Sequence, residues 1–203
     1  MRKALPVLAM VLAALQPLGG EIIDGIAAVV ARQAITRSEV EREARLEAFF
    51  QGQPPPDAAF GEELLQRLIR QRLIAPEMEQ TAFGASEAEV KRELDRMRPA
   101  GADPARHGLV ETDLLDFVRR QFDTLRFLDQ RFRPGLQVPA EEVDSYYQKV
   151  FLPELERRGA ASRPPLEEVR NRLEEILRQE RINVLVEAWL VEIRSRAGVR
   201  VVQ

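Results

Sequence analysis

The chain has 203 residues, of which 45% are hydrophobic and 31% charged, with a formal net charge of -3 and no cysteine. The lack of cysteine excludes disulfides, thiol nucleophiles and thiolate metal sites, and the mildly acidic balance does not favour a nucleic-acid binder. The proportions are ordinary for a soluble helical protein and suffice for one packed domain.

Residues 1–20 have the three parts of an export signal. A positive start (Arg2, Lys3) precedes an apolar run over residues 4–15 and a short polar break that ends in glycine. The apolar run is shorter than the roughly 20 residues that span a bilayer. We therefore expect a signal peptide that is removed after export. No clean Ala-x-Ala site precedes residue 21, so an uncleaved membrane anchor is the alternative.

Two short β-type runs open the remaining chain, at residues 27–31 and 34–36. Ser38 follows, and Glu41 stands three positions later, which is the spacing of a capping box at the start of a helix. The sequence therefore predicts a helix over residues 39–51, ended by a proline-rich loop.

Two further helices are expected next. Leucine and isoleucine recur at helical spacing over residues 61–82, and Gly84 is placed to end this helix in a left-handed conformation. Ser86 and Glu89 form a second capping-box pattern, which predicts a short, highly charged helix to about residue 98.

A helix over residues 113–133, capped by Thr112, carries the widest apolar face and is expected to lie centrally. Another helix opens after Pro139 and contains Tyr146 and Tyr147. These neighbours point about 100° apart on a helix, so one is expected to be buried and the other half-exposed.

The C-terminal part reads as a linker (158–165), a long amphipathic helix (166–196) and a strand after Gly198. Trp189 is interpreted as the packing anchor of that helix. A lone hairpin at the N-terminal end would be unstable in water. We therefore expect it to pair with the C-terminal strand, which makes residues 21–203 one mainly α-helical domain with a small β-sheet formed from both ends.

The order and spacing of five motifs resemble the SurA N-terminal domain family of chaperones. The motifs are Ile35-Thr36-x-Ser38-Glu39-Val40, Arg67-Leu68-Ile69-x-x-x-Leu73-Ile74-x-x-Glu77, Gly84-x-Ser86-x-x-Glu89-Val90, Val138-Pro139-x-Glu141-Glu142-Val143-x-x-Tyr146-Tyr147, and Trp189-Leu190 followed by Val199-Arg200-Val201. The resemblance covers most of residues 22–203 and implies a multi-helix SurA-type chaperone domain, whose helices occupy residues 21–157 before the linker.

Members of that family keep unfolded outer-membrane proteins soluble, and many carry a parvulin prolyl isomerase domain. Such a domain needs paired active-site histidines, whereas this chain has one histidine. About 20 residues separate Tyr147 from Leu166, which is too few for a parvulin module. We therefore expect no isomerase domain, no enzymatic activity, no cofactor and no metal site.

Given this resemblance, the aromatic side chains at helix ends and beside loops have two interpretations. They either complete the core or line an apolar groove that binds an unfolded chain. The candidate groove residues are Phe49, Phe50, Phe60, Phe83, Tyr147 and Phe151. Trp189, Ser38, Ser86 and Gly84 are assigned structural roles. His107 is interpreted as a solvated loop residue, and Glu141, Glu142 and Asp144 as an acidic helix start.

The sequence and the resemblance leave three candidate functions. The first is an ATP-independent periplasmic holdase for unfolded envelope or outer-membrane proteins. The second is a non-catalytic module that clasps one specific envelope partner or pairs with itself, so that monomer and homodimer both stay open. The third and least favoured is a prolyl isomerase. Nucleic acids and small-molecule substrates are not expected partners, and a membrane contact is expected only through an uncleaved signal.

Overall fold

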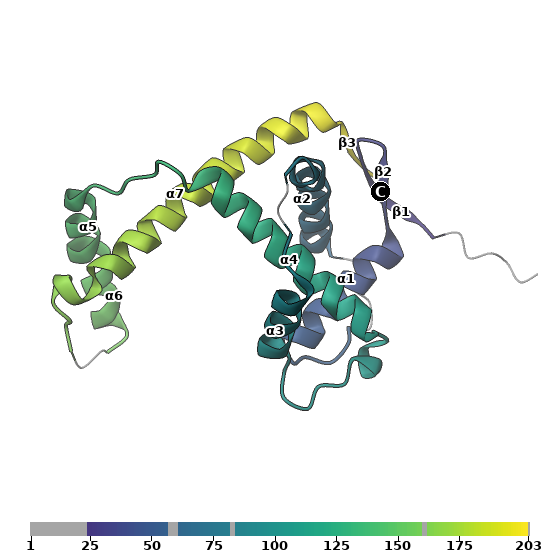
Figure 1. Cartoon of the computed structure of the whole chain (residues 1–203), viewed down its shortest axis with the longest axis horizontal. Helices are drawn as coiled ribbons and strands as arrows, with labels where there is room; N and C mark the ends of the chain where they lie inside the picture. The colour runs from purple at the N-terminus through teal and green to yellow at the C-terminus, as the bar shows by residue number, and fades with distance from the viewer. Residues whose placement is uncertain (1–23, 57–60, 82–83, 160–161, 203) are drawn as a thin grey trace, which may run out of the picture.

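The computed structural model describes residues 24–56, 61–81, 84–159 and 162–202, so the expected signal over residues 1–20 lies outside it. The described chain is mainly α-helical with one small sheet (Figure 1), as predicted. In chain order the elements are β1 (Ile26–Val30), β2 (Gln33–Thr36), α1 (Arg37–Phe50), α2 (Glu62–Glu79), α3 (Glu87–Met97), the 3-10 helix η1 (Pro104–His107), α4 (Glu111–Phe132), α5 (Ala140–Tyr146), the π-helical segment η2 (Tyr147–Phe151), α6 (Leu152–Arg157), α7 (Leu166–Ala197) and β3 (Val199–Val201).

The sheet joins the two ends of the described chain. Its strand order is β2-β1-β3, and both pairings are antiparallel. Ala28 pairs with Val201, and Val30 pairs with Val199. The predicted pairing of the N-terminal hairpin with the C-terminal strand is therefore confirmed, and it places the central strand next to a strand from the far end of the sequence.

Helix α1 begins before Ser38, and Thr36 is its N-cap: the Thr36 hydroxyl accepts a hydrogen bond from the Glu39 N–H at 3.3 Å. The predicted capping role of Ser38 is wrong. Its backbone N–H donates to Asp24 Oδ1 at 3.1 Å, and its hydroxyl donates to the other carboxylate oxygen. These bonds, together with one from Thr36, lower the pKa of Asp24 below its ordinary value. The segment before β1 is thereby fastened to the start of α1.

Helix α2 ends at Glu79, with Gln80 as a right-handed C-cap. The prediction that Gly84 ends this helix is therefore wrong. The chain instead turns onto α4, where the Ala85 N–H donates to Asp123 Oδ1 at 2.7 Å. The capping box of α3 is confirmed, because the Ser86 hydroxyl accepts from the backbone of Glu89 while the Glu89 carboxylate accepts from the backbone of Ser86.

Helix α4 begins after Val110, whose N–H donates to the Asp113 carboxylate at 2.8 Å. The predicted cap, Thr112, lies inside the first turn, so that assignment is wrong. The Asp113 carboxylate, three positions after Val110, accepts the backbone N–H at the start of the helix, as in the second half of a capping box.

A π-helical segment, η2, joins α5 to α6 in one continuous helical run. Pro153 explains it, because proline has no N–H to donate to the carbonyl of Lys149 and its ring would clash there. The wider turn bypasses that position, and the Leu152 N–H donates to the Tyr147 carbonyl. Sequence spacing predicted a helix here but not its wide turn.

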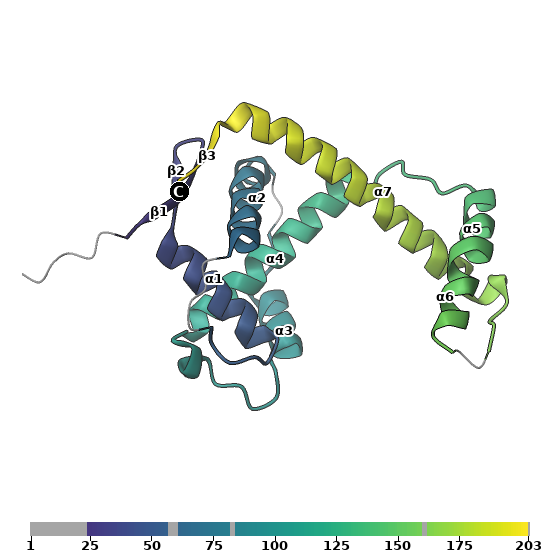
Figure 2. The same cartoon turned by 180° about the vertical axis from the view of Figure 1, so that it is seen from behind.

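Helix α7 contains 32 residues, which corresponds to about 48 Å at 1.5 Å per residue. It ends at Gly198, whose φ of 65° lies in the left-handed region and turns the chain into β3. Figure 1 and the reverse view in Figure 2 show α5 and α6 at one end of α7 and the sheet at the other, with α2 and α4 next to α7 and α1 and α3 farther from it.

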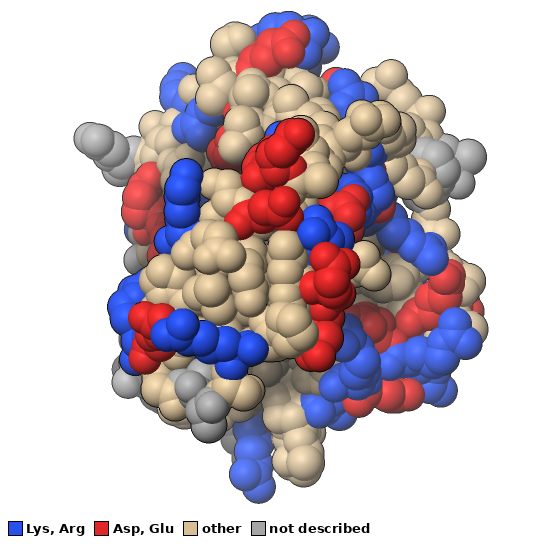
Figure 3. All heavy atoms as spheres, turned by 90° about the vertical axis from the view of Figure 1, so that its left-hand side faces the viewer, with Lys and Arg blue, Asp and Glu red and all other residues tan. Residues whose placement is uncertain are grey.

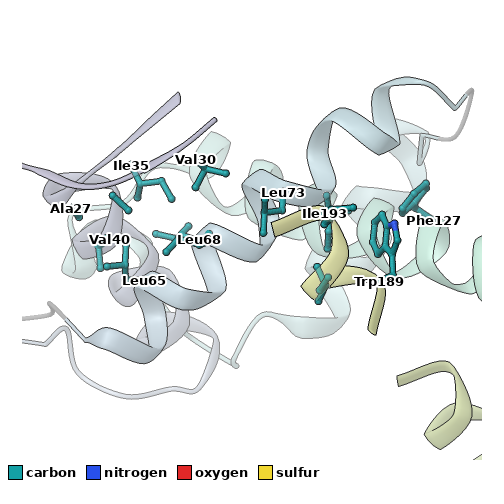
Figure 4. Close-up of a cluster of buried hydrophobic side chains, with 14 residues drawn as sticks. Ala27, Val30, Ile35, Val40, Leu65, Leu68, Leu73, Phe127, Trp189 and Ile193 are labelled. Carbon is teal, nitrogen blue, oxygen red and sulfur yellow. The ribbon is translucent and has the colours of Figure 1, made fainter. Parts of the chain in front are cut away.

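The largest hydrophobic cluster lies where the sheet, α2, α4 and α7 meet (Figure 4). Val30 and Ile35 come from the sheet, Leu65 and Leu73 from α2, and Trp189 from α7. Trp189 is 7% exposed and lies 6.0 Å from Phe127 between ring centroids, so it packs α7 against α4. A second cluster joins α1, α3 and α4, and a third joins α5, η2 and the N-terminal half of α7.

Candidate functional site

The predicted groove aromatics do not gather at one place. Phe49 and Phe50 belong to the cluster of α1, α3 and α4, whereas Tyr147 and Phe151 belong to the separate cluster of α5, η2 and α7. Phe60 and Phe83 lie outside the described residues. The four predicted aromatics that the structure describes therefore do not form a single groove.

Phe49 is a core residue. Its side chain is 0% exposed, and it meets the rings of Phe50 and His107 edge-on at centroid distances of 5.2 and 5.6 Å. Phe49 is therefore part of the packing beneath the surface. His107 is half-buried, and its Nε2 lies 2.8 Å from the carbonyl oxygen of Gln53, so its interpretation as a solvated loop residue is wrong.

Phe50 opens onto an apolar hollow between α1, α3 and α4. Its ring stacks on Phe117 with centroids 5.0 Å apart. The hollow measures about 400 Å³, and Met97, Phe122 and Leu125 complete its apolar lining. We call it the aromatic hollow. Leu125 is 63% exposed, although it lies on the central helix α4.

Charged side chains form the rim of the aromatic hollow. Arg67 of α2 pairs with Glu47 of α1. Within α3, Arg96 donates to Glu93 at 3.0 Å, and both side chains line the hollow. The hollow thus has an apolar floor and a rim whose charges are engaged with one another, an arrangement that suits an apolar ligand more than a charged one.

A second hollow of about 520 Å³ lies in the angle between α4 and α7, and we call it the α4–α7 crook. Leu125 lines both hollows, which therefore adjoin each other, and we call the two together the track. Leu128, Ile182 and Val186 provide the apolar part of the crook. Leu125 lies in the helix over residues 113–133 for which the sequence predicts a wide apolar face, but helical spacing alone could not show that this part of the face stays open.

A third hollow, of about 480 Å³ between α1, α2 and α4, is polar and contains the buried side chain of Glu43. Glu43 is 3% exposed, and Arg120 donates to its Oε2 at 2.9 Å. Burial raises the pKa of Glu43, while Arg120 works in the opposite direction. The arrangement joins α1 to α4, and we assign it a structural role.

At the other end of α7, Tyr147 and Phe151 stack with centroids 5.9 Å apart. The Tyr147 hydroxyl donates to the carbonyl oxygen of Pro164 at 2.9 Å, which fastens the linker to η2. Tyr147 is buried and Tyr146 half-buried, as predicted for neighbouring positions. Tyr147 therefore packs inside this unit, and Phe151 lies half-buried beside it.

The predicted acidic helix start at α5 also takes part in ion pairs with α7. Glu142 pairs with Arg181, and Asp144 pairs with Arg170 at 3.2 Å. Figure 3 faces the end of the molecule that carries α5 and α6, and there acidic and basic side chains are interspersed among uncharged ones. This face shows no field of a single sign that would attract a strongly charged partner.

Two features are absent from the described residues. No group of three or more histidine, cysteine, aspartate or glutamate side chains there could hold a metal ion. Within the same residues, no helix combines the length and apolar character needed to cross a membrane.

The described residues thus form a mainly helical fold, with a small sheet that joins β1 and β2 to β3 and with open apolar hollows along α4. No family model matches the chain. It is similar to Chaperone SurA of Alkalilimnicola ehrlichii, with 27% identity over 87% of this chain and 46% of that protein. It is also similar to Chaperone SurA of Bordetella avium, with 29% identity over 63% of this chain and 28% of that protein.

The chain spans about half the length of the first of these curated relatives and less of the second. The predicted resemblance to SurA-like chaperones is confirmed at the level of sequence. The chain is therefore SurA-like, and its relatives carry the name chaperone.

Proposed function

We propose that this protein is an ATP-independent holdase that shields apolar segments of unfolded envelope or outer-membrane proteins. The observation that carries the proposal is the track along α4, in which Leu125 lines both the aromatic hollow and the α4–α7 crook. Contiguous exposed apolar surface with a polar rim is typical of sites that bind other proteins. The similarity to proteins named Chaperone SurA supports the same reading.

The physical mechanism is reversible burial. An apolar segment that enters the aromatic hollow leaves water and gains about 25 cal/mol for each Å² of apolar surface removed from it. The client must give up conformational freedom to bind, which keeps the affinity modest and the release rapid. Neither step needs a nucleotide, and neither forms or breaks a covalent bond. A prolyl isomerase activity has no place in this mechanism.

The proposed compartment is the periplasm. The export-signal pattern of residues 1–20 supports it, since a positive start, an apolar run and a small-residue break direct chains across the inner membrane. The clients would then be proteins that cross the same membrane unfolded and have yet to assemble.

The experiment that tests the proposal is light scattering of a denatured outer-membrane β-barrel protein diluted into buffer, with and without the protein. We expect near-stoichiometric suppression of aggregation without ATP. Leu125→Glu places a charge where the two hollows join and is expected to weaken suppression by about tenfold, because a leucine contact worth 1.5–3 kcal/mol is replaced by a buried charge.

Val191→Glu is the matched control, because Val191 is 70% exposed on α7 and does not line the track. It should suppress aggregation as the unchanged protein does. Aggregation that proceeds at the same rate with and without the protein would contradict the holdase proposal.

A second candidate function is a dedicated interaction module, favoured by a bare apolar face on α7. Val184, Leu185 and Val191 are all exposed there, although each belongs to the helix that joins the two ends of the molecule. If this face binds a second copy or one folded partner, sedimentation will show a concentration-dependent species that Val191→Glu abolishes and Leu125→Glu does not.

A further inference from the structure

We infer that the α4–α7 crook binds the main chain of an extended client, while the aromatic hollow next to it takes apolar side chains. This inference rests on the proposed holdase function and assigns different chemistry to the two halves of its track. The occupant is an unfolded segment in extended conformation, recognised by its peptide groups and not by its sequence.

The charged groups of the crook are already paired within the protein. Arg126 bonds to Glu89 at 2.8 Å, and Asp129 accepts a hydrogen bond from Arg133 at 2.5 Å. The polar groups left over are therefore uncharged: the side-chain amides of Gln130, Gln179 and Asn183 line the same hollow. All three residues are exposed.

The orientation of these amides leaves both kinds of hydrogen-bonding group available. The Gln179 Nε2 donates to the Asn183 Oδ1 at 3.1 Å, one helical turn further along α7. This bond leaves the Gln179 oxygen as an acceptor and the Asn183 amino group as a donor, since each amide carries both. Gln130 lines the same hollow from α4.

A peptide group has the same chemistry as a side-chain amide, with one donor and one acceptor. An extended segment presents these groups along its whole length, about 3.3 Å apart per residue. Side-chain amides can therefore bind an extended chain of any sequence, whereas arginine or aspartate would select for client charge. Leu128, Ile182 and Val186 add apolar contact beneath them.

Because Leu125 lines both hollows, the two halves of the track can bind different parts of the same client. A client that places an apolar side chain among Phe50, Phe117 and Phe122 continues past Leu125 into the crook. Its side chains are held loosely there, and its backbone groups meet the amides. Such binding tolerates different sequences but requires an extended, unpaired backbone, which distinguishes an unfolded client from a folded one.

The test uses two fluorescein-labelled probes of about twelve residues, each about 40 Å long when extended. One is an alternating leucine–threonine peptide, and the other has an ester oxygen in place of every second N–H. Fluorescence anisotropy with the full protein is expected to show about threefold to tenfold tighter binding of the peptide, the ratio for one hydrogen bond of 0.5–1.5 kcal/mol.

The triple variant Gln130→Ala, Gln179→Ala, Asn183→Ala is expected to bind both probes equally, at the affinity that the unchanged protein has for the ester probe. Alanine is the best helix former, so the variant retains its helices. Gln148→Ala removes an exposed amide away from the track and should keep the discrimination.

Binding that Leu125→Glu weakens, with no preference between the probes, would overturn this inference and leave the holdase proposal standing. A preference that persists in the triple variant would overturn it as well. If neither probe binds and aggregation is not suppressed, the holdase proposal and this inference both fail.

Discussion

Trp189 shows how one side chain fastens α7 to the rest of the molecule. Its ring lies 5.6 Å from Phe132 and 6.0 Å from Phe127 between centroids, and the Arg131 guanidinium lies over it at 4.9 Å. Aromatic pairs at such distances add to the free energy of burial. Phe127, Arg131 and Phe132 of α4 thus all pack against one side chain of α7.

Trp189→Ala should therefore lower the free energy of unfolding by about 3–5 kcal/mol, because a large cavity replaces the buried ring. Urea denaturation followed by circular dichroism measures this change. Val191→Ala, two positions along the same helix but exposed, is the control and should change the same quantity by less than about 0.5 kcal/mol. A Trp189→Ala change below about 1 kcal/mol would show that the ring is not an anchor.

Glu43 and Glu89 illustrate two opposite environments for the same side chain. Burial raises the pKa of Glu43 above its ordinary 4.5. Hydrogen bonds from the Ser86 backbone and hydroxyl, and from Arg126, lower the pKa of Glu89 to about 2. The fold therefore favours the protonated form of Glu43 and the ionised form of Glu89.

The two glutamates should respond to pH with opposite signs. The Glu43 contribution to stability is present below the ordinary glutamate pKa and is lost as pH rises, so Glu43→Gln should raise the Tm at pH 7 and lose this advantage on acidification. The Glu89 contribution is present above the ordinary pKa and is lost as pH falls towards about 2, so Glu89→Gln should lower the Tm at pH 7.

Thermal scans between pH 7 and pH 3 measure both differences, and each variant serves as the control for the other. Tm differences of the same sign at pH 7, or differences that do not change with pH, would contradict the assignment of the two environments.

At the scale of residues, sequence predicted burial better than exposure. Trp189 and the tyrosine pair could be predicted because helical spacing defines which side of a helix is apolar. The opening at Leu125 could not, because it depends on how far α3 and α7 cover the face of α4. Ser38 was misassigned for a similar reason: its partner, Asp24, lies before β1, beyond the reach of a local capping pattern.

At the scale of elements, the junction between α7 and β3 depends on a single backbone conformation. Gly198 has a φ of 65°, which side chains with a Cβ rarely adopt. The glycine lets the long helix stop and the strand begin within one residue.

Gly198→Ala is therefore expected to destabilise the fold by about 1 kcal/mol, because alanine is strained in the left-handed region. Chemical denaturation measures the loss. Gly198→Asn is the matched variant and should cost less, since asparagine enters that region more readily. Equal losses for the two variants would indicate a packing effect and not backbone strain.

The sequence predicted every long helix and all three strands, because apolar periodicity extends over many residues and tolerates local errors. The residues at which helices begin and end were harder to predict from the sequence. Thr112 and Gly84 were both expected at boundaries, but Asp113 serves the start of α4, and α2 ends at Glu79. Several polar side chains compete for each helix end, and tertiary contacts such as Asp123 with Ala85 decide among them.

At the scale of the whole molecule, α7 is shared by two bodies. Its C-terminal half packs with the sheet, α2 and α4, and its N-terminal half packs with α5 and η2. Arg133 pairs with Glu175 at 2.9 Å, and Arg181 bonds to Glu142 and to the Gln137 carbonyl oxygen, so polar contacts secure the crossing between the bodies.

Deleting residues 199–203 should destabilise the body that contains the sheet, because β1 loses one of its two partners. We expect a lower Tm and faster hydrogen exchange in β1. Arg200→Ala changes an exposed side chain of the same strand without removing its backbone and is the control. An unchanged Tm after the deletion would show that the third strand contributes nothing to stability.

The sheet also bears on the order in which the molecule acquires its structure. Ala28 can meet Val201 only when nearly the whole sequence between them is available. While the chain emerges from a ribosome or an export channel, β1 has β2 as its one possible neighbour in the sheet and keeps an open edge. Closing so long a loop is slow, because its entropy is lost before the contact forms. The protein, which we propose binds unfolded chains, would itself pass through a stage in which one edge of β1 is unpaired. The pairing of β3 with that edge would end this stage.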